Sequence, residues 1–116
     1  MMDTAAARQR LEQIRSDLDR SILVLTGEHH DEWVPEYPKD PADAGAELAE
    51  TERAEAVLRL AKRQRSEVGD ALARIAQGTY GTCADCGAAV PEGRLEARPE
   101  AACCVACQAK RDRRRR

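Results

Sequence analysis

The N-terminal part of the chain carries apolar residues at a helical spacing. Between Thr4 and Thr26 these residues alternate four and three positions apart, apart from Ser21 in the register, and Ile22 widens the stripe. Such a period places apolar side chains on one face of a helix. The stripe consists of Ala7, Leu11, Ile14, Leu18 and Leu25. We therefore predict one amphipathic helix over about 4–26.

A second helical stripe follows a segment that has no period. After Gly27 the sequence EHHDEWVPEYPKDPADAG contains three prolines, which disfavour helix at the residues before them, so we predict a connection there. From about Ala46 the heptad spacing of a helical seam begins, and Gly78 is placed to end the helix. The seam consists of Ala54, Leu58, Ala61, Arg65, Val68, Leu72 and Ile75.

Two helices with apolar stripes bury those stripes most simply against each other. We therefore predict an antiparallel coiled-coil hairpin over residues 1–77, with an acidic tip near 28–45. Packing in a bundle or a dimer is the alternative for the same stripes. Arg65 is a charged residue at a seam position, and we expect its long side chain to reach water rather than to pair with an acid of the first helix.

Composition favours a thin, helical protein. The chain has 116 residues and no Phe, so a bulky aromatic core is not available, and 34% of its residues are charged. There is no apolar run of membrane-spanning length and no secretory signal at the N-terminus, which makes us expect a cytoplasmic protein without a membrane partner. The net charge of −2 conceals an acidic stretch between Glu28 and Glu55 and a basic end from Lys110 onward.

The strongest chemical signal is a pair of Cys-x-x-Cys motifs separated by seventeen residues. This layout is typical of a tetrahedral zinc site, because each two-residue gap lets both thiolates face one ion. We predict one structural zinc, since four thiolates leave no open position for catalysis. A redox dithiol and chance spacing are the alternatives. The predicted ligands are Cys83, Cys86, Cys104 and Cys107.

A fifth cysteine lies beside the third ligand. Pairing Cys103 with Cys107 would leave a three-residue gap, so Cys104 gives the better register. We expect Cys103 to be a small buried apolar residue, with a redox-sensing thiol as the alternative.

The cysteine region resembles the C-terminal zinc finger of the DksA/TraR family. The resemblance is carried by Tyr80-Gly81 before the first pair of cysteines, by the sequence RLEARP over 94–99, and by Cys104-x-x-Cys107-Gln108. It implies a mainly α fold: a coiled-coil hairpin, a small four-cysteine finger over 78–116, and a C-terminal helix. It also implies a transcription regulator that binds bacterial RNA polymerase in its secondary channel, often together with the alarmone ppGpp, and without DNA recognition.

The resemblance extends to the predicted tip. Asp40-Pro41-Ala42-Asp43 matches the family's Asp-x-x-Asp pattern, although Gly45 stands where the best-known members have Ala. The resemblance thus implies that Asp40 and Asp43 carry the regulatory effect. The alternative is that both are solvated turn acids, with Asp43 capping the second helix.

Other classes of function have less support. A zinc-ribbon nucleic-acid binder would use the arginines over 113–116, but the acidic pI and the lack of aromatic residues for base stacking disfavour it. A structural protein with a dimerisation arm is a further alternative. The sequence holds no nucleophile with a base partner, phosphate loop or open metal site, so we expect no enzyme.

Overall fold

The structure is an elongated assembly of helices. The computed structural model describes residues 3–27 and 41–115. This part of the chain contains α1 (Thr4–Thr26), α2 (Pro41–Gln77), α3 (Glu92–Ala97) and α4 (Val105–Arg114). Its extents are 62 × 31 × 20 Å. Over the same residues there is no strand, and Thr82 and Ala89 form one isolated antiparallel bridge. None of the described helices is both long and apolar enough to span a membrane.

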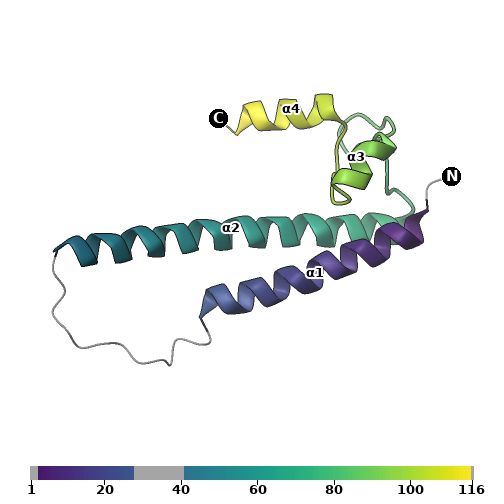
Figure 1. Cartoon of the computed structure of the whole chain (residues 1–116). Coiled ribbons are helices and arrows are strands. Elements are labelled where there is room, and N and C mark those ends of the chain that lie inside the picture. Colours follow the sequence, from purple (N-terminus) through teal and green to yellow (C-terminus); the bar gives the residue numbers. More distant parts are fainter. Residues whose placement is uncertain (1–2, 28–40, 116) are drawn as a thin grey trace.

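Helices α1 and α2 run antiparallel and pack along each other, which confirms the predicted coiled-coil hairpin (Figure 1). Leu11, Val68 and Ala71 are fully buried between them. Partly buried Ile14, Leu18, Leu72 and Ile75 extend this core. The two helices pack less tightly toward the start of α2, where Leu58 is only half-buried and Ala54 is exposed. The end of the hairpin formed by the start of α1 and the end of α2, which we call its base, is therefore its best-packed part.

Helix α1 has the predicted bounds because both of its ends are capped. The Asp3 carboxylate accepts hydrogen bonds from the backbone N–H groups of Ala5 and Ala6, at 3.1 and 3.2 Å. An acid at this position satisfies amide donors that have no partner inside the helix. At the other end Gly27 adopts a left-handed conformation with φ of 74°, which glycine accepts without steric cost.

Helix α2 begins earlier than the sequence pattern predicts. It starts at Pro41 rather than near Ala46, so residues 41–45 of the predicted tip are helical. Proline is well suited to the first position of a helix, where its missing N–H is not needed. Asp43 consequently lies in the first turn, where its negative charge interacts favourably with the positive end of the helix dipole. Asp40 and the rest of the predicted tip, 28–40, lie outside the described residues.

The seam arginine is paired rather than simply solvated. Arg65 forms an ion pair and hydrogen bond with Asp19 of α1, and both side chains remain about half exposed, at 50% and 45%. Our expectation that Arg65 would reach water instead of pairing was therefore wrong. The charge is tolerated in the seam because its partner sits on the facing helix while solvent still reaches both groups.

The remaining residues fold back over the base of the hairpin. Helix α4 corresponds to the C-terminal helix that the resemblance implies, whereas the short helix α3 between the cysteine pairs was not predicted. Leu95 of α3 is buried with Val90, Cys83, Cys103 and Cys107 in a second, smaller core. In Figure 1 this unit lies beside the end of α2 and the start of α1.

Candidate metal centre

The four predicted ligand cysteines come together at one point of the smaller core. The sulfur atoms of Cys83, Cys86, Cys104 and Cys107 all lie within 4.8 Å of one another. Cys83 and Cys107 are buried, Cys104 is partly buried and Cys86 is exposed. The four residues are therefore positioned to bind one metal ion.

Each pair of cysteines is held by a local backbone turn. In the first pair, the N–H of Gly87 donates to the Cys83 carbonyl at 3.0 Å, and Gly87 has a φ of 77° that favours glycine. In the second pair, Cys104 is the residue preceding α4 and Cys107 lies in the first turn, with the N–H of Gln108 donating to the Cys104 carbonyl at 2.9 Å. A turn of this size brings the two sulfurs of each pair to the same side.

Backbone hydrogen bonds also join the two halves of the site. The N–H of Ala84 donates to the Ala102 carbonyl at 2.9 Å, and that of Cys83 donates to the Ala88 carbonyl at 2.7 Å. The chain between the cysteine pairs is thereby tied to the first turn. The site is assembled by tertiary contacts as well as by the short motifs.

The donor set and its dimensions fit zinc. Four sulfurs each about 2.3 Å from a tetrahedral zinc ion lie about 3.8 Å apart. The sulfurs of Cys86 and Cys104 are 3.9 Å apart, which agrees with one edge of such a tetrahedron. Zinc is the expected ion. Four thiolates would complete its coordination, so the ion would hold the fold together and leave no position for water or substrate.

The protein environment acts on individual thiols of the cluster. Backbone hydrogen bonds from Cys104 and Cys86 lower the pKa of the Cys83 thiol to about 5. Side-chain hydrogen bonds with Cys104 and Cys83, together with burial, raise the pKa of the Cys107 thiol to about 12. A bound divalent cation would favour the thiolate form of all four ligands.

Cys103 lies outside the cluster, as the spacing predicts. Its side chain is fully buried, and its sulfur is 3.7 Å from Oδ2 of Asp85. Burial raises the pKa of this thiol, so the neutral form is favoured. Cys103 therefore belongs to the apolar core of the finger, together with Val90 and Leu95.

An ion pair that the sequence analysis missed attaches α4 to the first cysteine pair. Arg111 donates from Nε and an Nη to the two carboxylate oxygens of Asp85, at 2.7 and 2.6 Å. This bidentate contact holds the pKa of Asp85 below its usual value. The only sequence signal was an acid inside the first motif and a base one turn beyond the second. Neither feature indicates a contact by itself.

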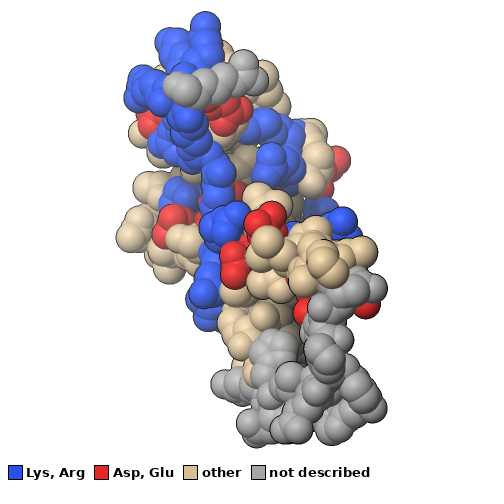
Figure 2. All heavy atoms as spheres, turned by 90° about the vertical axis from the view of Figure 1, so that its left-hand side faces the viewer, with Lys and Arg blue, Asp and Glu red and all other residues tan. Residues whose placement is uncertain are grey.

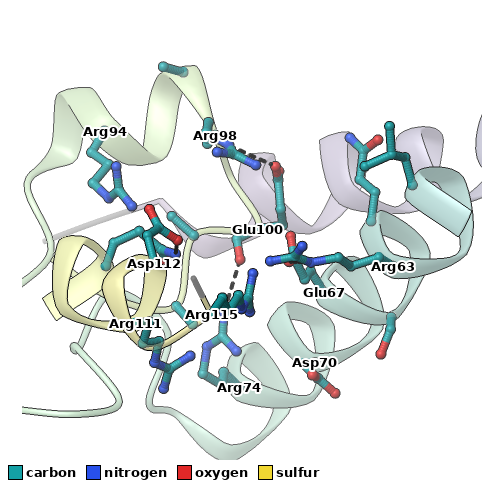
Figure 3. A pocket seen from close by; sticks show the side chains of 17 residues that line it. Arg63, Glu67, Asp70, Arg74, Arg94, Arg98, Glu100, Arg111, Asp112 and Arg115 are labelled. Carbon is teal, nitrogen blue, oxygen red and sulfur yellow. Dashed lines mark hydrogen bonds and ion pairs between the residues drawn. The ribbon is translucent and has the colours of Figure 1, made fainter. Parts of the chain in front are cut away.

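A charged cleft separates α2 from α4. Its volume is about 910 Å³, and it is lined by six arginines and four acids from α2, α4 and the chain around α3 (Figure 3). Several of these groups already pair, including Arg98 with Glu100 at 3.3 Å and Arg63 with Glu67 at 3.4 Å. The arginines are Arg63, Arg74, Arg94, Arg98, Arg111 and Arg115.

The C-terminal end of α4 is strongly basic. Its last turn carries Arg111, Arg113 and Arg114, whose positive charges interact favourably with the negative end of the helix dipole. In Figure 2 Lys and Arg side chains gather at the top of the molecule, over this end of α4, whereas basic and acidic groups intermingle below it.

The comparisons with known proteins agree with this architecture. Residues 78–113 match the family described as the prokaryotic dksA/traR C4-type zinc finger. Two proteins from strains of Caulobacter vibrioides, each named RNA polymerase-binding transcription factor DksA, are 42% identical to this chain over 71 residues. The match covers 59% of this chain and 49% of each relative, so the chain spans about half the length of the curated relatives it matches.

Two solved structures resemble nearly the whole chain. Transcription factor DksA2 from Pseudomonas aeruginosa has a TM-score of 0.73 and 28% identity, covering 96% of this chain and 84% of that one. The DnaK suppressor protein from Agrobacterium tumefaciens has a TM-score of 0.65 and 27% identity, covering 95% of each chain. Residues 78–113 therefore match the DksA/TraR C4-type zinc finger, and the fold of the described chain resembles that of the DksA2 structure.

Proposed function

We propose that this chain is a cytoplasmic transcription regulator that binds bacterial RNA polymerase through the secondary channel of the enzyme. The finger and the base of the hairpin dock on the polymerase, and the far end of the hairpin reaches toward the active centre to modulate initiation. The chain acts by binding and not by catalysis, because its metal ion is structural.

One observation carries this proposal. The resemblance to DksA2 extends over hairpin and finger together, covering 96% of the chain, and is not confined to the cysteine motif that many zinc proteins share. The curated relatives are named for RNA polymerase binding. The hairpin is also long enough to reach into a channel of the polymerase, since the 37 residues of α2 span about 55 Å.

Within this proposal, the acids Asp40 and Asp43 act at the far end of the hairpin. Asp43 is exposed in the first turn of α2, where its carboxylate lies close to the helix start. Carboxylate oxygens suit hard cations such as the Mg²⁺ of a polymerase active centre. We include ppGpp as an accessory ligand at the interface between this chain and the polymerase.

The central experiment measures binding of the zinc-loaded chain to purified core RNA polymerase, with a fluorescent label on the chain. We expect saturable binding that a protein of known secondary-channel binding displaces, and reduced or increased transcript yield from sensitive promoters. Duplex DNA without polymerase is the parallel sample. Binding to that DNA at physiological salt, without binding to polymerase, would instead support the nucleic-acid alternative.

The tip acids are tested by Asp40→Asn and Asp43→Asn, with Glu50→Gln on the exposed surface of α2 as the matched control. We expect the two tip variants to bind polymerase with nearly unchanged affinity and to lose the effect on transcript yield. Removing the first-turn charge of Asp43 costs only about 0.3–1 kcal/mol of helix stability, so the fold remains. Full regulatory activity of both variants at saturating protein would contradict this role.

A further inference from the structure

The connection between the hairpin and the finger is short, and its first residues are held on the end of α2, where the N–H of Thr79 donates to the Arg74 carbonyl at 2.9 Å. Gly78 and Gly81 flank it with φ values of 78° and 87°, and only Thr79 and Tyr80 lie between them. Among the described helices, α1 and α2 are the only pair in close backbone contact. Beyond this connection, the hydrogen bonds that join the finger to the hairpin are made by side chains.

Tyr80 is the side chain that joins the two cores. It packs against the hairpin core around Leu11 and Val68, and also against the finger core around Leu95 and Cys103. Its hydroxyl donates to the carbonyl of Pro99 at 2.8 Å. Burial raises the pKa of Tyr80, which keeps the phenol neutral and able to donate. One residue thus gives both apolar contact and a directional bond.

Two arginines add to this contact from the two hairpin helices. Arg10 of α1 donates to the carbonyl of Glu96, and Arg74 of α2 donates to the carbonyl of Glu100 at 3.5 Å. Together with Tyr80 of the connection, the two arginines of the hairpin base make three donors that reach carbonyls within the single segment 96–100. Three separate contacts on one short segment restrict its rotation, whereas a single contact would leave it free to rotate.

The segment that accepts these bonds is itself well held in the finger. Pro99 and Glu100 are buried, and Arg98 pairs with the Glu100 carboxylate at 3.3 Å. The N–H of Ala101 donates to the Arg98 carbonyl at 3.0 Å. Movement of this segment is thus movement of the finger as a whole.

We propose that Tyr80, Arg10 and Arg74 are positioning residues that set the direction in which the hairpin projects from the zinc finger. The length of the hairpin amplifies any change of orientation at its base. With α2 spanning about 55 Å, a tilt of about 10° at the base displaces the far end by roughly 10 Å. A displacement of that size separates a side chain from any target at hydrogen-bonding distance.

The direct test measures residual dipolar couplings on the isotopically labelled, zinc-loaded full chain. For the native protein we expect couplings from α2 and from α4 to fit one alignment tensor. The double variant Tyr80→Phe with Arg10→Gln keeps the tyrosine ring packing and removes two of the three bonds. In it we expect separate tensors for hairpin and finger, with one zinc per chain retained in both. Arg8→Gln, an exposed change two residues from Arg10, is the matched control.

Each result decides between positioning and other roles. A common tensor in the double variant overturns the proposal. Loss of zinc or of the folded finger would make Tyr80 a folding residue and likewise contradicts it. Because Arg10 lies on the exposed surface of α1, Arg10→Gln alone is the second variant; it should lower the order of the finger relative to the hairpin without changing zinc content.

The consequence for transcription rests on the proposed function and is measured separately. If the chain binds polymerase, the double variant should have a reduced effect on transcript yield when it is added at a concentration that saturates the enzyme. If the native chain does not bind polymerase, the proposed function fails while the dipolar couplings still test the joint. The two failures are thus distinguishable.

Discussion

Leu11 gives the sharpest test of how the hairpin is stabilised. Its side chain is fully buried against Val68 and Ala71 at the base of the two helices. Leu→Ala substitutions in packed cores cost about 2–5 kcal/mol, and the value falls toward the lower end where neighbours can relax into the space. A two-helix core is thin and open at its sides, so we expect Leu11→Ala to lower the free energy of unfolding by about 2–3 kcal/mol.

This loss is large for a protein with so few fully buried side chains. Domains of this size have total stabilities of about 5–15 kcal/mol. At about 4 °C of melting temperature per kcal/mol near this chain length, Leu11→Ala should melt about 10 °C below the native protein. The assay is urea unfolding followed by far-ultraviolet circular dichroism, at one fixed concentration of free zinc, because bound metal adds to apparent stability.

The matched control is Leu60→Ala, the same chemical change on the same hairpin at a side chain that is 65% exposed. Substitutions at such positions usually change stability by no more than about 0.5 kcal/mol. Equal losses for the two variants, or a loss below about 1 kcal/mol for Leu11→Ala, would refute the packed hairpin base.

Two further predictions concern the finger and its joint. Cys104→Ser should release the zinc, whereas Cys103→Ser should retain one ion per chain by elemental analysis, and the reverse result would show that the ligand register is wrong. Tyr80 should titrate above pH 10.0 in the absorbance of a Tyr37→Phe variant, since burial raises its pKa. Its neutral form then stabilises the fold fully below that pH and loses this contribution as the pH rises through the raised value, a loss that Tyr80→Phe should abolish.

Helical pattern and cysteine spacing predicted the parts of the fold that local sequence determines. The bounds of α1 follow from an apolar stripe ended by Gly27. Cys83, Cys86, Cys104 and Cys107 meet at one point because two-residue gaps form turns wherever the surrounding chain allows a metal site. In α1 and within each cysteine pair, the residues that decide the structure lie within a few positions of one another. The two pairs are brought together by tertiary contacts such as the hydrogen bond from the Ala84 N–H to the Ala102 carbonyl.

The sequence predictions failed where one residue type can have two structural roles. Pro41 was taken with the other prolines as part of the connection, whereas proline also begins helices, and α2 starts there. Arg65 interrupts the seam in sequence, and only the facing helix decides between solvent and a partner. Helix α3 is six residues long, which is too short for a periodic signal.

Sequence patterns do not predict the orientation of the finger on the hairpin. The three bonds of the joint connect residues that are 86, 26 and 19 positions apart. Their acceptors are backbone carbonyls, which every residue possesses, so no acceptor residue type marks the contact. An arginine on the exposed side of a helix and a tyrosine beside two glycines have many other uses. A related chain can therefore keep the same cysteine spacing and heptad pattern while a substitution of Arg10, Arg74 or Tyr80 changes the direction of its hairpin. Similarity of the hairpin and of the finger, each taken alone, does not establish that the far end of the hairpin lies at the same position.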